Sequence, residues 1–166
     1  VIADEAHKLL ANKRLYTYFH SLSKRSENIL LLSATPVQQK KEAYLALLQL
    51  IMPDKYDHFS IEDFQTLVEK QKNITKSTYL VLQDFDDYIN NIADTLEDGE
   101  NPLENDDCTD LFDDIQNGLR RISRLIEDEG FDKVLSEINL ESEDYGKGAI
   151  QEALLYVCEN YQLEKN

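Results

Sequence analysis

Two adjacent carboxylates near the start of the chain have residue types and a position that could do chemistry. Asp4 and Glu5 directly follow the apolar residues 1–3, which are typical of the end of a strand. Ligands of open parallel sheets bind outside the carboxyl ends of the strands. One carboxylate there could hold Mg²⁺, and the other could orient an attacking water for phosphoryl transfer from a nucleotide. Taken alone, the pair is more simply read as a solvated helix start, where acids are favoured.

A second apolar run ends in small polar residues and predicts a second strand. Residues 29–32 are all apolar, and residues 33–36 read Ser-Ala-Thr-Pro. Such a run between breakers favours a strand that is buried on both faces. Between the two runs, apolar residues recur at helical spacing and predict a helix over residues 12–25. This stripe consists of Leu15, Tyr18, Phe19 and Leu22. Strand, helix and strand in this order predict a βαβ unit with parallel strands.

The rest of the chain is predicted to be helical. Ser60 and Asp63 have the spacing of a capping box, residues 97–107 read as a loop, and Gly130 is predicted to end a helix. Gly118 lies inside one stripe, where a close helix crossing or a break could explain it. The predicted apolar stripes are Tyr44, Leu47, Leu48 and Ile51; Ile61, Phe64, Leu67 and Val68; Val81, Phe85, Tyr88, Ile89, Ile92 and Leu96; Phe112, Ile115, Leu119, Ile122 and Ile126; Phe131, Val134, Leu135 and Ile138; and Ile150, Leu154, Val157 and Tyr161.

Composition limits the partners of the chain. The net charge is −16, and residues 77–119 contain thirteen Asp or Glu residues and no Lys or Arg. Nucleic-acid binding depends on neutralising phosphates, so this acidic segment is not expected to touch DNA or RNA. No apolar run approaches the ~18 residues of a membrane span. Cys108 and Cys158 form no metal-binding or disulfide pattern, which fits a reduced, cytoplasmic compartment.

Two motifs together resemble a known family. "VIADEAH" looks like motif II, the Walker B or DEAH-box element, of superfamily-two helicase-like ATPases, and "LLLSATPVQ" looks like their motif III. "EAYLALLQLIMPDKY" resembles the Swi/Snf-type branch, and residues 29–73 are most similar to bacterial members related to RapA, the RNA-polymerase-associated ATPase. The resemblance covers residues 1–73. It implies that residues 1–54 are the C-terminal part of the first RecA-like ATPase lobe and that residues 55–166 are an acidic all-helical spacer. The expected fold is mostly α with a βαβ remnant.

The resemblance also implies roles for individual residues. Asp4 would contact the Mg²⁺ shell through water, and Glu5 would be the catalytic carboxylate that positions water for ATP hydrolysis. His7 would link the nucleotide site to motif III, although a surface histidine at a helix start is the plainer alternative. Ser33 and Thr35 would couple hydrolysis to movement on nucleic acid. The same two residues could also simply end a strand and cap the next helix.

Contacts to nucleic acid are harder to assign. Gln38 matches a family position near the bound strand, but it could equally be an exposed polar residue. Tyr44, Tyr88 and Tyr161 could stack on bases, but their apolar helix faces favour core packing. His20 and His58 match no motif. The best candidates for backbone phosphate contact form a small basic group: Lys13, Arg14, Lys24, Arg25, Lys40 and Lys41.

The resemblance implies that the parent protein is an ATP-driven translocase that remodels complexes on duplex DNA in the bacterial cytoplasm. RNA polymerase or another protein would be a partner of the spacer. Two alternatives remain: a strand-separating DNA or RNA helicase of the same superfamily, and a helical protein-interaction module whose partner would be, for example, a basic or a polymerase-associated protein. The chain contains no GxxxxGK[ST] phosphate loop. We therefore expect it to be an internal piece that begins within a strand and does not hydrolyse ATP alone.

Overall fold

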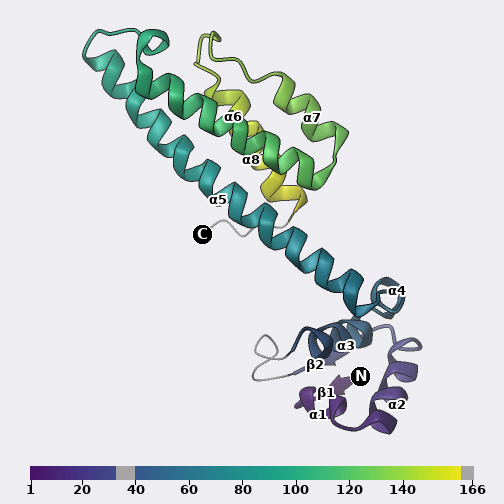
Figure 1. Ribbon diagram of the computed structural model, residues 1–166. Helices are drawn as coiled ribbons and strands as arrows, with labels where there is room; N and C mark the ends of the chain where they lie inside the picture. The colour runs from purple at the N-terminus through teal and green to yellow at the C-terminus, as the bar shows by residue number, and fades with distance from the viewer. Residues whose placement is uncertain (33–39, 162–166) are drawn as a thin grey trace. The chain divides into compact units, whose positions relative to one another are not determined.

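The structure is a computed structural model that describes residues 1–32 and 40–161. Its mostly α fold with a small parallel sheet confirms the predicted fold class (Figure 1). None of the helices in these residues is long and apolar enough to span a bilayer. The elements follow in the order β1 (Ile2–Ala3), α1 (His7–Leu10), α2 (Lys13–Ser23), β2 (Leu30–Leu31), α3 (Lys41–Ile51), α4 (Pro53–Tyr56), α5 (Ile61–Glu97), the 3₁₀ turn η1 (Pro102–Glu104), α6 (Asp106–Ile126), α7 (Glu129–Ser136) and α8 (Lys147–Asn160).

The chain folds as two compact units, which we call the N-terminal unit (Val1–Val68) and the helical unit (Glu69–Asn166). The division between them falls within α5. The boundary predicted between residues 54 and 55 concerns where an ATPase lobe ends, and it stays a prediction.

In the N-terminal unit, β1 and β2 pair in parallel, as the βαβ pattern predicts. Ile2 lies opposite Leu30, and Ala3 lies opposite Leu31. The parallel pairing places the carboxyl ends of both strands at one edge of the sheet. One buried cluster of the unit joins β1, α1 and α3 and consists of Ala3, Ala6, Leu9, Leu47 and Leu50.

Three packing predictions for this unit are wrong. β2 is not buried on both faces, since Leu30 is 50% exposed. The face of α2 that packs on the core carries Tyr16 and Phe19, whereas Tyr18 is 64% exposed and Leu15 is also exposed. The apolar residues of α2 occupy two faces, and the hydroxyl of Tyr16 stabilises one orientation by donating to the backbone oxygen of Ala46 at 3.1 Å. On α3, Tyr44 is likewise exposed rather than in the core.

Helix α5 is one continuous helix of 37 residues, where the sequence pattern predicts two separate helices. Its first turn confirms the capping box: the Ser60 hydroxyl accepts from the backbone N–H of Asp63 at 3.0 Å, and Ser60 Oγ donates to Asp63 Oδ2 at 2.8 Å. Between the two predicted helices, Ile74 and Thr78 are buried on the core side. Thr78 donates its hydroxyl to the backbone oxygen of Ile74. Thr78 therefore occupies a core position. Because it is polar, it interrupts the apolar stripe in the sequence, and one helix is predicted as two.

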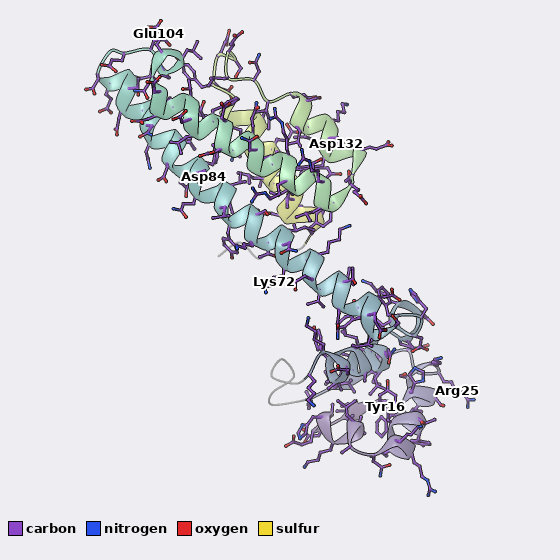
Figure 2. All side chains as sticks on the ribbon, viewed as in Figure 1. Tyr16, Arg25, Lys72, Asp84, Glu104 and Asp132 are labelled. Carbon is purple, nitrogen blue, oxygen red and sulfur yellow. The ribbon has the colours of Figure 1, made fainter. Side chains whose placement is uncertain are left out.

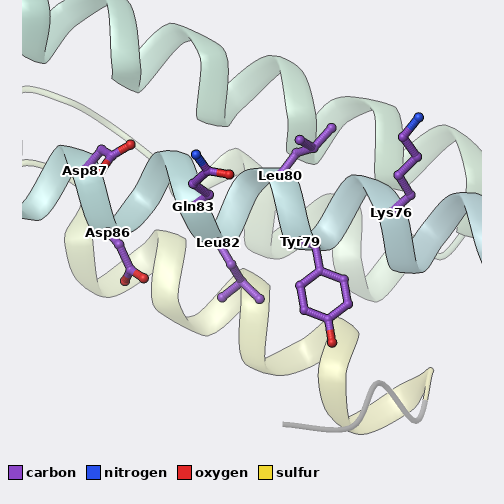
Figure 3. Close-up of a pocket in the computed structure, with 7 residues that line it drawn as sticks. All are labelled: Lys76, Tyr79, Leu80, Leu82, Gln83, Asp86 and Asp87. Carbon is purple, nitrogen blue, oxygen red and sulfur yellow. The ribbon is translucent and has the colours of Figure 1, made fainter. Parts of the chain in front are cut away.

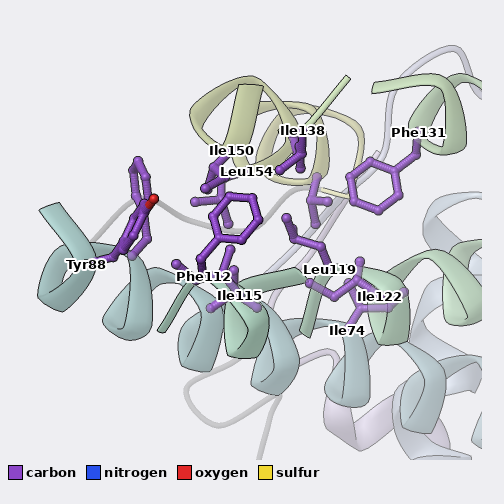
Figure 4. Packing of buried hydrophobic residues seen from close by; sticks show 14 of the residues in the cluster. Ile74, Tyr88, Phe112, Ile115, Leu119, Ile122, Phe131, Ile138, Ile150 and Leu154 are labelled. Atoms are coloured by element: carbon purple, nitrogen blue, oxygen red, sulfur yellow. The ribbon is translucent and has the colours of Figure 1, made fainter. Parts of the chain in front are cut away.

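The core of the helical unit lies between α5, α6, α7 and α8 (Figure 4). Gly118 of α6 faces Val81 of α5, so the close helix crossing is the correct explanation of this glycine. Tyr88 is fully buried, as predicted, and Tyr161 packs against the same core. The completely buried side chains include Tyr88, Ile115, Leu119, Ile122, Phe131, Ile150 and Val157.

Two helix boundaries in this unit differ from the predictions. α6 ends at Ile126 with Glu127 in a left-handed conformation (φ 53°), and Gly130 lies inside α7. Asp128 is the reason, because its carboxylate accepts from the backbone N–H groups of Gly130 and Phe131 and so starts a new helix. Residues 97–107, predicted as a loop, contain η1 and the first turn of α6, which Asn105 caps.

Candidate functional site

The acidic turn after β1 has a strained backbone. Asp4 Oδ1 accepts from the backbone N–H of Glu5 at 2.8 Å. Glu5 adopts the left-handed conformation with a φ of 52°. A side chain other than glycine costs roughly 1 kcal/mol or more in this region. Glutamate is therefore present here at the expense of backbone stability, and such residues cluster at functional sites.

The carboxylate of Glu5 lies beside the ring of His7. Oε2 of Glu5 is 3.2 Å from Nδ1 of His7, and the two side chains are 45% and 34% exposed. The pair is close enough for an ion pair when the imidazole is protonated, but its angles are not those of a hydrogen bond. Nδ1 of His7 is itself shielded from solvent and has no hydrogen-bond partner among the described residues. The turn thus places one carboxylate beside one imidazole, with no hydrogen bond between them.

Backbone hydrogen bonds attach this turn to the end of β2. The N–H of Ala6 donates to the backbone oxygen of Leu32 at 2.9 Å, and the N–H of Leu32 donates to the oxygen of Ala3 at 2.9 Å. Leu32 is the residue directly before Ser33. The structure therefore brings Asp4, Glu5 and His7 to the edge of the sheet where β2 ends. Ser33, Thr35 and Gln38 lie outside the described residues.

The turn suits a divalent cation that is held mainly by groups other than protein side chains. The described residues contain no group of three or more His, Cys, Asp or Glu side chains that could hold a metal ion. Asp4 offers a single exposed carboxylate, one of whose oxygens is engaged by the Glu5 N–H. Magnesium needs only one or two carboxylates and completes its six ligands with water and phosphate oxygens. The donor set at Asp4 fits Mg²⁺ bound together with a phosphate ligand.

The basic candidates lie on the same unit but do not form one cluster of free charges. Lys13 and Arg14 begin α2, where the side chain of Asn12 accepts from the backbone N–H of Arg14 at 3.1 Å. Lys40 directly precedes α3, and Lys41 is its first residue. All four are exposed.

Lys24 has a structural partner that the sequence pattern does not reveal. Its Nζ lies 2.5 Å from Asp57 Oδ2, and His20 Nε2 lies 2.6 Å from Asp57 Oδ1. His20 lies in α2 and Lys24 directly follows its last residue, and their spacing of four residues, which puts them on the same side, is the sequence signal for this contact. Burial alone would raise the pKa of Asp57, but the hydrogen bonds from Lys24 and His20 outweigh it and lower the pKa. This trio holds α2 against the segment that follows α4.

Comparison with known proteins bears directly on this turn. A family model for the SNF2-related domain matches residues 1–104. The matched region contains the strand pair, the Asp4–Glu5 turn and the whole of α5. No solved structure matches the chain.

Proposed function

The chain belongs to the SNF2-related domain family of helicase-like ATPases, and from this we propose that it is part of an ATP-driven translocase on duplex DNA. The single observation that supports the proposal best is the conformation of Glu5. Its backbone is strained, its carboxylate lies 3.2 Å from the His7 ring, and both residues follow a strand whose end is aligned with that of β2. Ligands of open parallel sheets bind at such strand ends, which supports a role for this carboxylate beside a bound nucleotide.

In this proposal each residue of the turn has one role. Mg²⁺ bound with ATP would neutralise charge on the phosphate oxygens. Asp4 would hold the magnesium through water, and Glu5 would orient the attacking water and accept its proton. His7 is the first residue of α1 and lies beside Glu5, and it would link the nucleotide site to motif III. The phosphate-binding loop would come from another part of the protein.

The roles proposed for residues outside the acidic turn rest on the motifs as well as on the structure. The Ala6–Leu32 hydrogen bond joins the acidic turn to the end of β2. A displacement of Glu5 during hydrolysis would therefore be transmitted along the backbone toward Ser33 and Thr35. We propose that these residues transmit hydrolysis to movement on DNA, with Gln38 near the bound strand. Lys13, Arg14, Lys40 and Lys41 would contact backbone phosphates. The motifs favour the RapA-related branch, and with it RNA polymerase as a partner.

The test is the ATPase activity of the full-length protein with and without duplex DNA. Wild-type protein is expected to show duplex-stimulated turnover, and Glu5→Gln is expected to lose about 100-fold or more, since a positioned general base contributes about that factor. Glu27→Gln is the matched control, because Glu27 is exposed and lies outside the turn. Turnover that ignores Glu5 would overturn the proposal. Stimulation by single strands instead of duplex would point to a strand-separating helicase.

A further inference from the structure

An open hollow of about 730 Å³ runs along the outer side of α5 in the helical unit. Two rows of side chains border it (Figure 3). Tyr79, Leu82 and Asp86 project from one side of the helix, and Leu80 and Asp87 project from the other. The hollow is therefore an elongated strip that follows the helix axis, apolar toward one end and acidic toward the other.

The apolar side chains of the hollow are partly exposed, and the helix that carries them is fixed. Tyr79 is 49% exposed and Leu80 is 47% exposed. Leu82 is half-buried, because it packs against the core of the unit. The helix that carries them is fixed from behind by Val81 and Phe85, both of which are buried in that core. A ligand would therefore meet a surface whose backbone is already ordered, which lowers the entropic cost of binding.

The segment that carries most of the hollow is strongly acidic in sequence. No Lys or Arg occurs in residues 77–119, which contain thirteen acidic residues; Lys76, at one end of the hollow, is the nearest basic residue before them. Asp84 is half-buried between α5 and α6, and its pKa is raised by burial and by the charges of Asp114 and Asp87. The acidic surface extends over the unit, where Glu104 and Asp132 are exposed (Figure 2). Positive charge brought to this face would be attracted.

We propose that this hollow docks a short basic amphipathic helix of a partner protein. Apolar side chains of that helix would cover Tyr79, Leu80 and Leu82, and its Lys or Arg side chains would meet Asp86 and Asp87. This occupant satisfies both the apolar strip and the charge. A second copy of the chain carries the same net charge of −16, and nucleic acid carries phosphates, so neither is favoured over a basic partner. The inference does not depend on the motor activity proposed above.

The probe is a fluorescent peptide of lysine and leucine whose leucines form one helical stripe, added to the full chain and followed by anisotropy. A scrambled peptide of the same composition carries the same charge without the stripe. We expect the striped peptide to bind more tightly than the scrambled one. Leu80→Ser should weaken the striped peptide by about tenfold, because an exposed leucine then no longer contributes buried apolar area. Asp86→Asn with Asp87→Asn should weaken it by a similar factor.

The matched control removes the same charge from α6, outside the hollow. Asp110→Asn with Asp113→Asn, both exposed, should change affinity by less than about twofold. Equal effects of the two Asp pairs, equal binding of the two peptides, or no effect of Leu80→Ser would each show nonspecific charge attraction and overturn the proposal. Amide chemical-shift mapping on the unaltered chain is a second measurement that needs no variant. Shifts centred on residues 76–87 support the hollow, and shifts confined to other elements refute it.

Discussion

Gly118 of α6 lies so close to Val81 of α5 that a Cβ built on the glycine would overlap Val81 Cγ2. Gly118→Ala should therefore destabilise the helical unit, although alanine favours a helix by about 1 kcal/mol. Overpacking in a rigid core typically costs about 1–3 kcal/mol. Val81 is buried and short, so it cannot swing away. We expect a lower urea midpoint by far-UV circular dichroism.

The control for this prediction is a double-mutant cycle with Val81→Ala. Val81→Ala alone should destabilise the unit, because it leaves a cavity. In that background, Gly118→Ala should be neutral or stabilising, since the added methyl group fills the space of the valine. If Gly118→Ala costs the same in both backgrounds, the glycine is needed for a reason other than the crossing.

Tyr88 links the core of the helical unit to the turn before α8. Its hydroxyl donates to the backbone oxygen of Tyr145 at 2.8 Å, and Tyr145 has a left-handed φ of 56°. Tyr88→Phe should cost about 1–2 kcal/mol, because the Tyr145 carbonyl loses its partner inside the protein. Tyr18→Phe, at a ring that is 64% exposed, is the control and should be near neutral. Equal midpoints for wild type and Tyr88→Phe would show that water replaces the bond.

The strain at Glu5 predicts opposite effects on stability and activity. Glu5→Gly should stabilise the N-terminal unit relative to Glu5→Gln by about 1 kcal/mol, because glycine adopts a φ of 52° without steric cost. Both variants should lose ATPase activity in the full-length protein. Thermal unfolding followed by circular dichroism measures the difference. At Glu42, which lies inside α3, the control should give the opposite order: Glu42→Gln should be more stable than Glu42→Gly. A glycine variant less stable than Glu5→Gln would rule out strain in this turn.

Asp57 should make the stability of the N-terminal unit depend on pH in the acidic range. The pKa of Asp57 is lowered in the folded protein, where the bonds from Lys24 and His20 outweigh the effect of burial. In the unfolded chain it titrates near its ordinary value of 3.8. The folded state then binds fewer protons than the unfolded state in this range, so stability is present above about pH 4 and is lost as the pH falls through the folded pKa.

Urea unfolding of Asp57→Asn at a series of pH values measures this contribution. The variant should be less stable than wild type at pH 6, where the Asp57 carboxylate is ionised and accepts from Lys24, and the difference should shrink as the pH falls through the lowered pKa of Asp57. Glu27→Gln removes the same charge without a partner of this kind and should show a smaller, flatter difference. A difference for Asp57→Asn that does not change with pH would mean that packing, not charge, is responsible.

Local patterns predict much of the fold correctly. The capping box at Ser60 and Asp63 and the parallel pairing of the two apolar runs are present as predicted. The capping box depends on residues three positions apart, and the strand pairing depends on two short apolar runs. Both are therefore visible in the local sequence. The predictions fail where both faces of a helix are apolar, as at Tyr18 of α2, or where a polar residue occupies a core position, as at Thr78 of α5. Periodicity alone cannot tell which of two faces meets the core.

Residue types and their order are enough to predict the candidate catalytic turn, the family resemblance and the acidic character of the helical unit. Four relationships are visible only in the folded chain: Glu5 is strained and faces His7, Lys24 is paired with Asp57, Gly118 lies under Val81, and apolar and acidic side chains border one hollow on α5. Each of these relationships depends on distances and dihedral angles. Packing sets them through contacts between residues that a linear pattern does not bring together.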